Sequence, residues 1–162
     1  MPNETSYHPY QQLETRLPTA FIAGFLGVLI FHQLMLMLLH DLGLTALTSY
    51  PMGATAPFDV PRVLSLAFWG GLWAIPLALI LARMHSQAGF WLTALLFGAI
   101  GPSVVNWLVV MPIKGMPMGG GWHPSGILTA LIINGAWGVG TALILYWASR
   151  RSSEMHPHLP AH

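Results

Sequence analysis

Polar side chains inside long apolar segments are the residues of this chain most able to do chemistry. His32 and Gln33 are adjacent near the middle of the first segment. Asn134 lies inside the last segment, and Asn106 lies inside the third, one helical turn after Ser103. Because an ionisable or amide group is costly in lipid, such residues suggest a site for a solute, an ion or a proton. They are also typical of interhelical hydrogen bonds that only hold a bundle together.

A second set of residues, at the ends of these segments, could bind a metal. The set is His40, Met116, Met118 and His123. Imidazole and thioether groups suit Cu(I), so copper binding is one hypothesis. Met118 also belongs to a repeated turn motif, in which it would only shape the turn.

Haem b is a further hypothesis, because a membrane haem needs two axial ligands at similar depth. His32 is the only histidine in the middle of an apolar segment, so a methionine would have to be the second ligand. Signals of catalysis are poorer: the segments hold no acidic pair, and the serines lie in no recognisable nucleophile motif. The sequence predicts that the chain is not an enzyme.

Composition indicates a membrane protein. Of the 162 residues, 54% are hydrophobic and 7% are charged, whereas a soluble domain carries about 25% charged residues. The six basic residues are scattered and cannot form the dense basic face that nucleic-acid binding requires. Cysteine is absent, which excludes thiol catalysis and disulfides.

Four apolar segments are long enough to cross a bilayer, which takes about 20 residues. They are Thr19–His40, Val63–Ala82, Ala88–Met111 and Ser125–Ala148. Because backbone polar groups must be satisfied inside lipid, each segment is predicted to be a helix. We expect an all-α, integral membrane four-helix bundle over residues 19–148, with a polar N-terminal segment 1–18 and a tail 149–162.

The polar residues fall at comparable depths in these helices. Counting about 1.5 Å per residue from the predicted outer ends, His32 lies ~12 Å deep, Asn106 ~8 Å and Asn134 ~15 Å. All three lie in the outer half of the membrane. We therefore expect that His32, Gln33, Ser103, Asn106 and Asn134 can form one polar cluster.

Basic residues set the expected orientation, because they are enriched on the cytoplasmic side. The side of the two termini carries Arg16, Arg83, Arg150 and Arg151, and the other side carries Arg62 and Lys114. Both termini are therefore predicted to be cytoplasmic.

An internal repeat is the strongest pattern in the chain. The motif Pro51-Met52-Gly53 recurs as Pro117-Met118-Gly119. The helix after each motif also matches, since GGLWAIPLALIL (70–81) lies over NGAWGVGTALIL (134–145) and aligns Trp73 with Trp137. This favours a duplication, with repeats at about 19–84 and 88–148 that are related by an axis along the membrane normal.

Small residues recur four apart in each predicted helix, for example at Ala20 and Gly24 and at Ala94 and Gly98. Such stripes let helix backbones approach closely in lipid. They indicate packing within one bundle or, alternatively, an interface with a partner.

Three stretches together resemble a known group of proteins. They are FHQ (31–33), PRVLSLAFWGGLW (61–73) and NGAW (134–137). They resemble an uncharacterised group of small bacterial four-helix inner-membrane proteins, over most of residues 20–148. The resemblance implies a bacterial inner-membrane location and carries over no activity and no catalytic residue.

Three classes of function remain open. The leading one is a non-catalytic subunit or accessory component of a larger membrane complex, which charge-free helices with small-residue faces fit. The second is a small homo-oligomeric transporter or channel with a polar site in the outer half of the membrane. The third is a copper- or haem-binding membrane protein. The expected partners are the bilayer, and other membrane-protein subunits or the chain itself.

Overall fold

The computed structural model describes residues 17–56 and 58–155, and the side chains as far as residue 151. Four of its helices are long and apolar enough to cross a membrane: Leu17–Asp41, Arg62–Leu81, Gln87–Ile113 and Pro124–Arg151. The predicted all-α four-helix architecture is confirmed. The four candidate spans indicate a multi-pass membrane protein.

Two of the four spans contain a wider, π-helical turn. The first span consists of α1 (Leu17–Gly27), the π-helical turn Val28–His32 and α2 (Gln33–Asp41). The second is α3 (Arg62–Leu81). The third consists of α4 (Gln87–Val105), the π-helical turn Asn106–Val110 and α5 (Met111–Ile113), and the fourth lies in α6 (Pro124–Met155). A 3-10 turn, Met118–Gly121, and two antiparallel strands, β1 (Ala54–Thr55) and β2 (Val60–Pro61), lie in the loops.

Local sequence accounts for several helix starts. The Ser86 side chain accepts a hydrogen bond from the Gly89 amide at 3.0 Å and so caps α4. Pro61 precedes α3, and Pro124 is the first residue of α6, a position at which the missing amide hydrogen costs nothing.

The outermost helices are longer than the sequence predicted. The first begins at Leu17, inside the segment assigned to a polar terminus, and α6 runs to Met155 rather than to residue 148. The extension of α6 includes a stacking contact of Arg150 on the Tyr146 ring, a pair four residues apart on one helix face. The rest of the predicted terminal segments, 1–16 and 156–162, lies outside the described residues.

The helices pair closely through small residues. α1 packs on α3 and on α6, and α4 packs on α6. At Gly24 in α1, an added Cβ would meet the Gly70 carbonyl oxygen and the Ala74 side chain. At Gly98 in α4, it would come within 2.7 Å of the Asn134 carbonyl oxygen and of the Gly138 Cα. These parts of the small-residue stripes are therefore covered within the chain.

Two tryptophan side chains pack against glycines of a neighbouring helix. Trp137 of α6 lies 3.2 Å from the position that a Gly27 Cβ would occupy. Trp73 of α3 lies 3.4 Å from the same position at Gly101 in α4, and its ring makes an edge contact with Phe97. The two contacts join α6 to the first span and α3 to the third.

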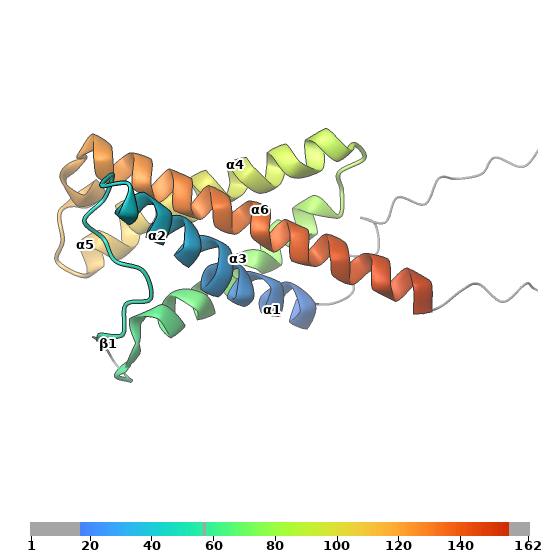
Figure 1. Cartoon of the computed structure of the whole chain (residues 1–162), viewed down its shortest axis with the longest axis horizontal. Coiled ribbons are helices and arrows are strands. Elements are labelled where there is room, and N and C mark those ends of the chain that lie inside the picture. Colours follow the sequence, from blue (N-terminus) through green and yellow to red (C-terminus); the bar gives the residue numbers. More distant parts are fainter. Residues whose placement is uncertain (1–16, 57, 156–162) are drawn as a thin grey trace, which may run out of the picture.

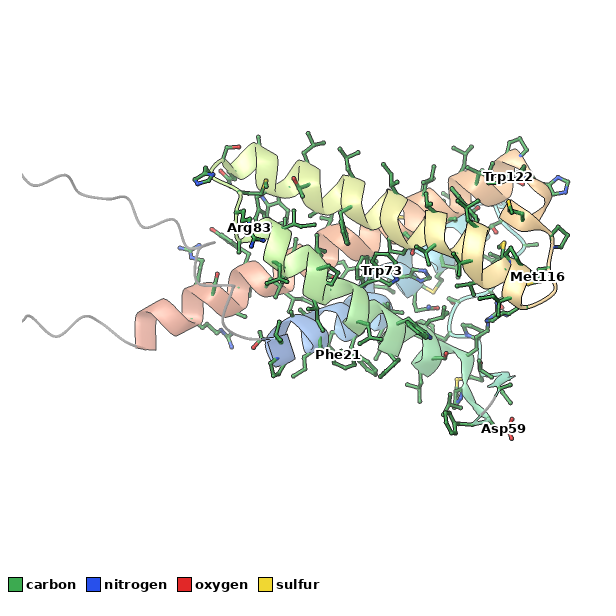
Figure 2. All side chains as sticks on the ribbon, turned by 180° about the vertical axis from the view of Figure 1, so that it is seen from behind. Phe21, Asp59, Trp73, Arg83, Met116 and Trp122 are labelled. Carbon is green, nitrogen blue, oxygen red and sulfur yellow. The ribbon has the colours of Figure 1, made fainter. Side chains whose placement is uncertain are left out.

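The bundle has two distinct ends. The α3–α4 turn lies at the same end as the start of α1 and the end of α6, and both longer loops lie at the other end (Figure 1). In Figure 2 the labelled Arg83 marks the first of these ends, and Asp59, Met116 and Trp122 mark the second. We call the first the arginine end and the second the loop end.

Candidate functional site

The first π-helical turn leaves a backbone carbonyl without its helical partner. The Gln33 amide donates to the carbonyls of Ile30 and Val28 instead of to that of Leu29, which an α-helix would use. The Leu29 carbonyl accepts a hydrogen bond from the Tyr50 hydroxyl, at 2.9 Å. An irregular turn in the helix thus creates an acceptor, and a loop residue satisfies it.

Tyr50 is bound to the first span at a second point. Its backbone amide donates to Gln33 Oε1 at 2.6 Å, and the Gln33 side chain is fully buried. Tyr50 has a φ of +49°, an unusual value for a residue with a side chain. These two hydrogen bonds hold the backbone in that conformation.

The loop that carries Tyr50 returns along the bundle. Gln33 precedes the end of α2 at Asp41 by eight residues, or about 12 Å of helix. Beside Tyr50, the Pro51 carbonyl accepts from the Val63 amide at 2.9 Å, in the first turn of α3. The loop therefore links the middle of the first span to the start of the second.

The hydrogen bonds of Gln33 determine the tautomer of the His32 ring. A backbone amide can only donate, so Gln33 Oε1 must face Tyr50 and Gln33 Nε2 must face His32 Nδ1, at 3.3 Å. Nδ1 therefore accepts, and the proton of the neutral ring is on Nε2. The His32 side chain is 9% exposed, so this chain of hydrogen bonds runs from the loop into the bundle.

A second polar pair joins α4 to α6. Asn134 Nδ2 donates to Ser103 Oγ at 2.9 Å, and Ser103 is fully buried. Asn106 is half-buried at the start of the second π-helical turn. Within the described residues, its side chain forms no hydrogen bond, and no hydrogen bond joins the two pairs. Four of the five predicted cluster residues thus form two separate pairs.

The predicted metal ligands lie at the loop end. His40 Nδ1 donates to the Thr45 carbonyl at 3.2 Å, a contact that closes the end of α2. Met116, Met118 and His123 are exposed on the loop before α6. The described residues contain no group of three His, Asp or Glu side chains suited to a metal. Binding of copper or haem stays a prediction.

The sequence did not predict the hydrogen bonds that Tyr50 and Trp137 donate to the first span. Trp137 is 2% exposed, and its Nε1 donates to the Gly24 carbonyl at 3.0 Å. Its alignment with Trp73 marked the position but not the bond. Tyr50 directly precedes the first Pro-Met-Gly motif, and this adjacency was the available signal.

One buried hydroxyl is left without a hydrogen bond. Thr141 is fully buried, and its Oγ1 has no partner among the described residues. It is the nearest atom to the position that a Gly27 Cβ would take. It therefore lies in the direction of a Gly27 Cα–H bond, the geometry of a weak C–H···O contact between helices.

No protein-family model, curated protein or solved structure matches the chain.

Proposed function

We propose that this chain is a non-catalytic integral membrane protein and serves as a subunit or accessory component of a larger membrane complex. The observation that carries the proposal is that four polar side chains inside the helices are hydrogen-bonded to partners in the same chain. The Gln33 side chain is hydrogen-bonded to Tyr50 and His32, and the Asn134 side chain is hydrogen-bonded to Ser103. A polar group bonded to its own chain stabilises the bundle and is not available to a substrate.

An exposed aromatic face on α3 supports a protein partner. Trp69 is 58% exposed and Phe68 is 49% exposed. Trp69 lies seven residues, or about 10 Å of helix, from the start of α3 at Arg62. Tryptophan in lipid prefers the membrane interface, where its N–H group finds water. At this depth, contact with another protein satisfies the ring better than lipid does.

The test is purification in mild detergent followed by measurement of the intact mass. We expect a second kind of subunit at a fixed ratio, and we expect Trp69→Leu to release it while the chain stays folded. Trp147→Leu is the matched control, since Trp147 is 61% exposed at the arginine end. A particle made only of this chain, or equal loss of the partner with both variants, refutes the proposal.

A small homo-oligomeric transporter or channel is the second candidate. The two π-helical turns favour it, because one ends at His32 and the other begins at Asn106, and such turns are frequent at functional sites. A lone symmetric oligomer in the same mass measurement, together with loss of solute flux on Asn106→Leu, would support this candidate instead.

We also propose that the two helix pairs arose by duplication. Equivalent contacts support this: Gly24 meets Gly70 and Ala74, and Gly98 meets Asn134 and Gly138. The alignment of Trp73 with Trp137 places Gly70 on Asn134 and Ala74 on Gly138. The register that places Gly24 on Gly98 also places His32 on Asn106, so the two polar residues beside the π-helical turns correspond.

The proposed location is the bacterial inner membrane, with the arginine end in the cytoplasm. Arg83 and Arg150 lie at that end, and basic residues are enriched on the cytoplasmic side.

A further inference from the structure

Charged side chains divide unevenly between the two ends of the bundle. Among the described side chains, the arginine end carries three basic groups and no acid: Arg83, Arg150 and Arg151. The loop end carries two groups of each sign: Asp41, Asp59, Arg62 and Lys114. Figure 2 shows Arg83 and Asp59 at opposite ends. The positive charge of the arginine end is therefore not balanced by a described carboxylate.

Arg150 is held on an aromatic platform that spans two helices. Its guanidinium lies 5.6 Å from the centre of the Tyr146 ring, and its Nη1 is 3.4 Å from the Tyr146 hydroxyl. The Tyr146 ring lies 6.3 Å from the ring of Trp91, near the start of α4. Tyrosine and tryptophan rings favour the level of lipid headgroups. The platform thus places a guanidinium where headgroups lie.

Arg83 is held at the same end by a different neutral group. Its Nη1 donates to the Leu79 carbonyl at 2.8 Å. A neutral partner leaves the charge of the guanidinium uncompensated, and Arg83 and Arg150 are both exposed. Guanidinium groups bind phosphate oxygens through paired N–H donors.

We propose that Arg83 and Arg150 bind the phosphate groups of anionic phospholipids at the arginine end. Ordering of the two guanidiniums by neutral partners reduces the entropy lost when a headgroup binds. The aromatic platform at Trp91 and Tyr146 provides the apolar surface that an acyl chain contacts and that a free phosphate ion does not use. This inference is independent of the function proposed above.

The test measures retention of phosphatidylglycerol by the purified full-length protein, using native mass spectrometry. The Arg83→Gln/Arg150→Gln double variant should bind about 25-fold more weakly, from about fivefold for each charge removed. Arg83→Lys/Arg150→Lys should bind at a level between the parent and the glutamine variant, because it keeps both charges and loses the paired donors. Circular dichroism checks that each variant is folded. The matched control is Arg62→Gln/Lys114→Gln, which removes two charges at the loop end and should bind like the parent.

Three results of the lipid-binding measurements would overturn the inference, and a fourth concerns inorganic phosphate. The three are unchanged binding in the arginine double variant, an equal loss in the loop-end control, and equal binding of phosphatidylcholine by the parent protein. Inorganic phosphate distinguishes the two sources of phosphate. If it displaces the lipid at millimolar concentration, the site recognises phosphate alone, and the assignment to phospholipid is wrong.

Discussion

Gln33 shows how one side chain can satisfy two neighbours inside a bundle. Its carbonyl oxygen accepts from the Tyr50 amide, and its amide nitrogen donates to His32. A buried amide without partners would cost ~1–3 kcal/mol. The sequence identified Gln33 as a costly residue, but the loop that satisfies it lies 17 positions away, at Tyr50. Only the fold brings the two together.

At the residue scale, Gly98 provides a direct test of the close helix contact. Gly98→Ala would place a Cβ within 2.7 Å of the Asn134 carbonyl oxygen, and backbone cannot shift cheaply. We expect a loss of roughly 1–3 kcal/mol in the free energy of unfolding, measured by thermal denaturation in detergent. Gly126→Ala is the control, because nothing lies within 4 Å of the added Cβ. Equal effects of the two substitutions would show that the contact is not close.

The hydrogen bond of Trp137 makes a second prediction at this scale. Trp137→Phe keeps an aromatic ring but leaves the buried Gly24 carbonyl without its side-chain donor. The free energy of unfolding should fall by ~1–3 kcal/mol. The fall should be smaller for Trp73→Phe, because Trp73 is only half-buried and contacts Gly101 and Phe97 through its ring. A larger loss in the Trp73 variant would contradict this assignment of the bond.

At the scale of elements, the loop between α2 and α3 is hydrogen-bonded to the first span through Tyr50. The motif Pro51-Met52-Gly53 follows Tyr50 in this loop, and its backbone is irregular with a bend at Gly53. The return of the loop to the depth of Gln33 was not predictable, because it depends on the carbonyl that the π-helical turn releases at Leu29. Hydropathy reports how apolar a helix is and contains no information on one widened turn.

The contact of this loop with the first span predicts that His32 is poorly accessible to solvent. The chain has no cysteine, so a His32→Cys variant carries a single thiol. We expect slow reaction of that thiol with a membrane-impermeant reagent, and at least tenfold faster reaction when Tyr50→Ala is added. Met116→Ala, in the loop before α6, is the control and should leave the rate unchanged. If Tyr50→Ala has no effect on the rate, the loop does not cover this position.

The helices themselves were predictable to within a few residues at most ends. Length and hydropathy define a span, because lipid requires every backbone group to be bonded within the helix. The end of α6 was not predictable by the same rule. Its last turns, with Arg150 and Arg151, are polar, and hydropathy cannot distinguish a polar helical turn from a polar tail.

At the scale of the whole molecule, the small-residue stripes are used inside the chain. Gly24, Gly70 and Gly98 all lie at helix contacts of the bundle. The sequence predicted such contacts but could not decide between a partner and the chain's own helices, because both use the same residues. What the bundle leaves outside is bulky, as at Trp69 and Phe68.

The two ends of the molecule predict the topology in the membrane. Ala46 lies on the first loop and His85 on the α3–α4 turn, and both are exposed. The variants Ala46→Cys and His85→Cys therefore each carry one accessible thiol. A membrane-impermeant reagent added to whole spheroplasts should label Ala46→Cys at once and His85→Cys only after lysis. The reverse pattern would place the arginine end outside and contradict the proposed orientation.

The polar groups inside the helices are proposed to hold the protein together and not to act on a substrate. The most direct test compares the intact mass and melting temperature of the parent particle with those of its His32→Gln variant, in mild detergent. We predict that the variant keeps the same partner at the same ratio and melts at a lower temperature, because Gln33 loses the imidazole acceptor at Nδ1. A variant that folds and melts like the parent but has lost the partner, or a parent particle that contains only this chain, would contradict this role of the polar groups.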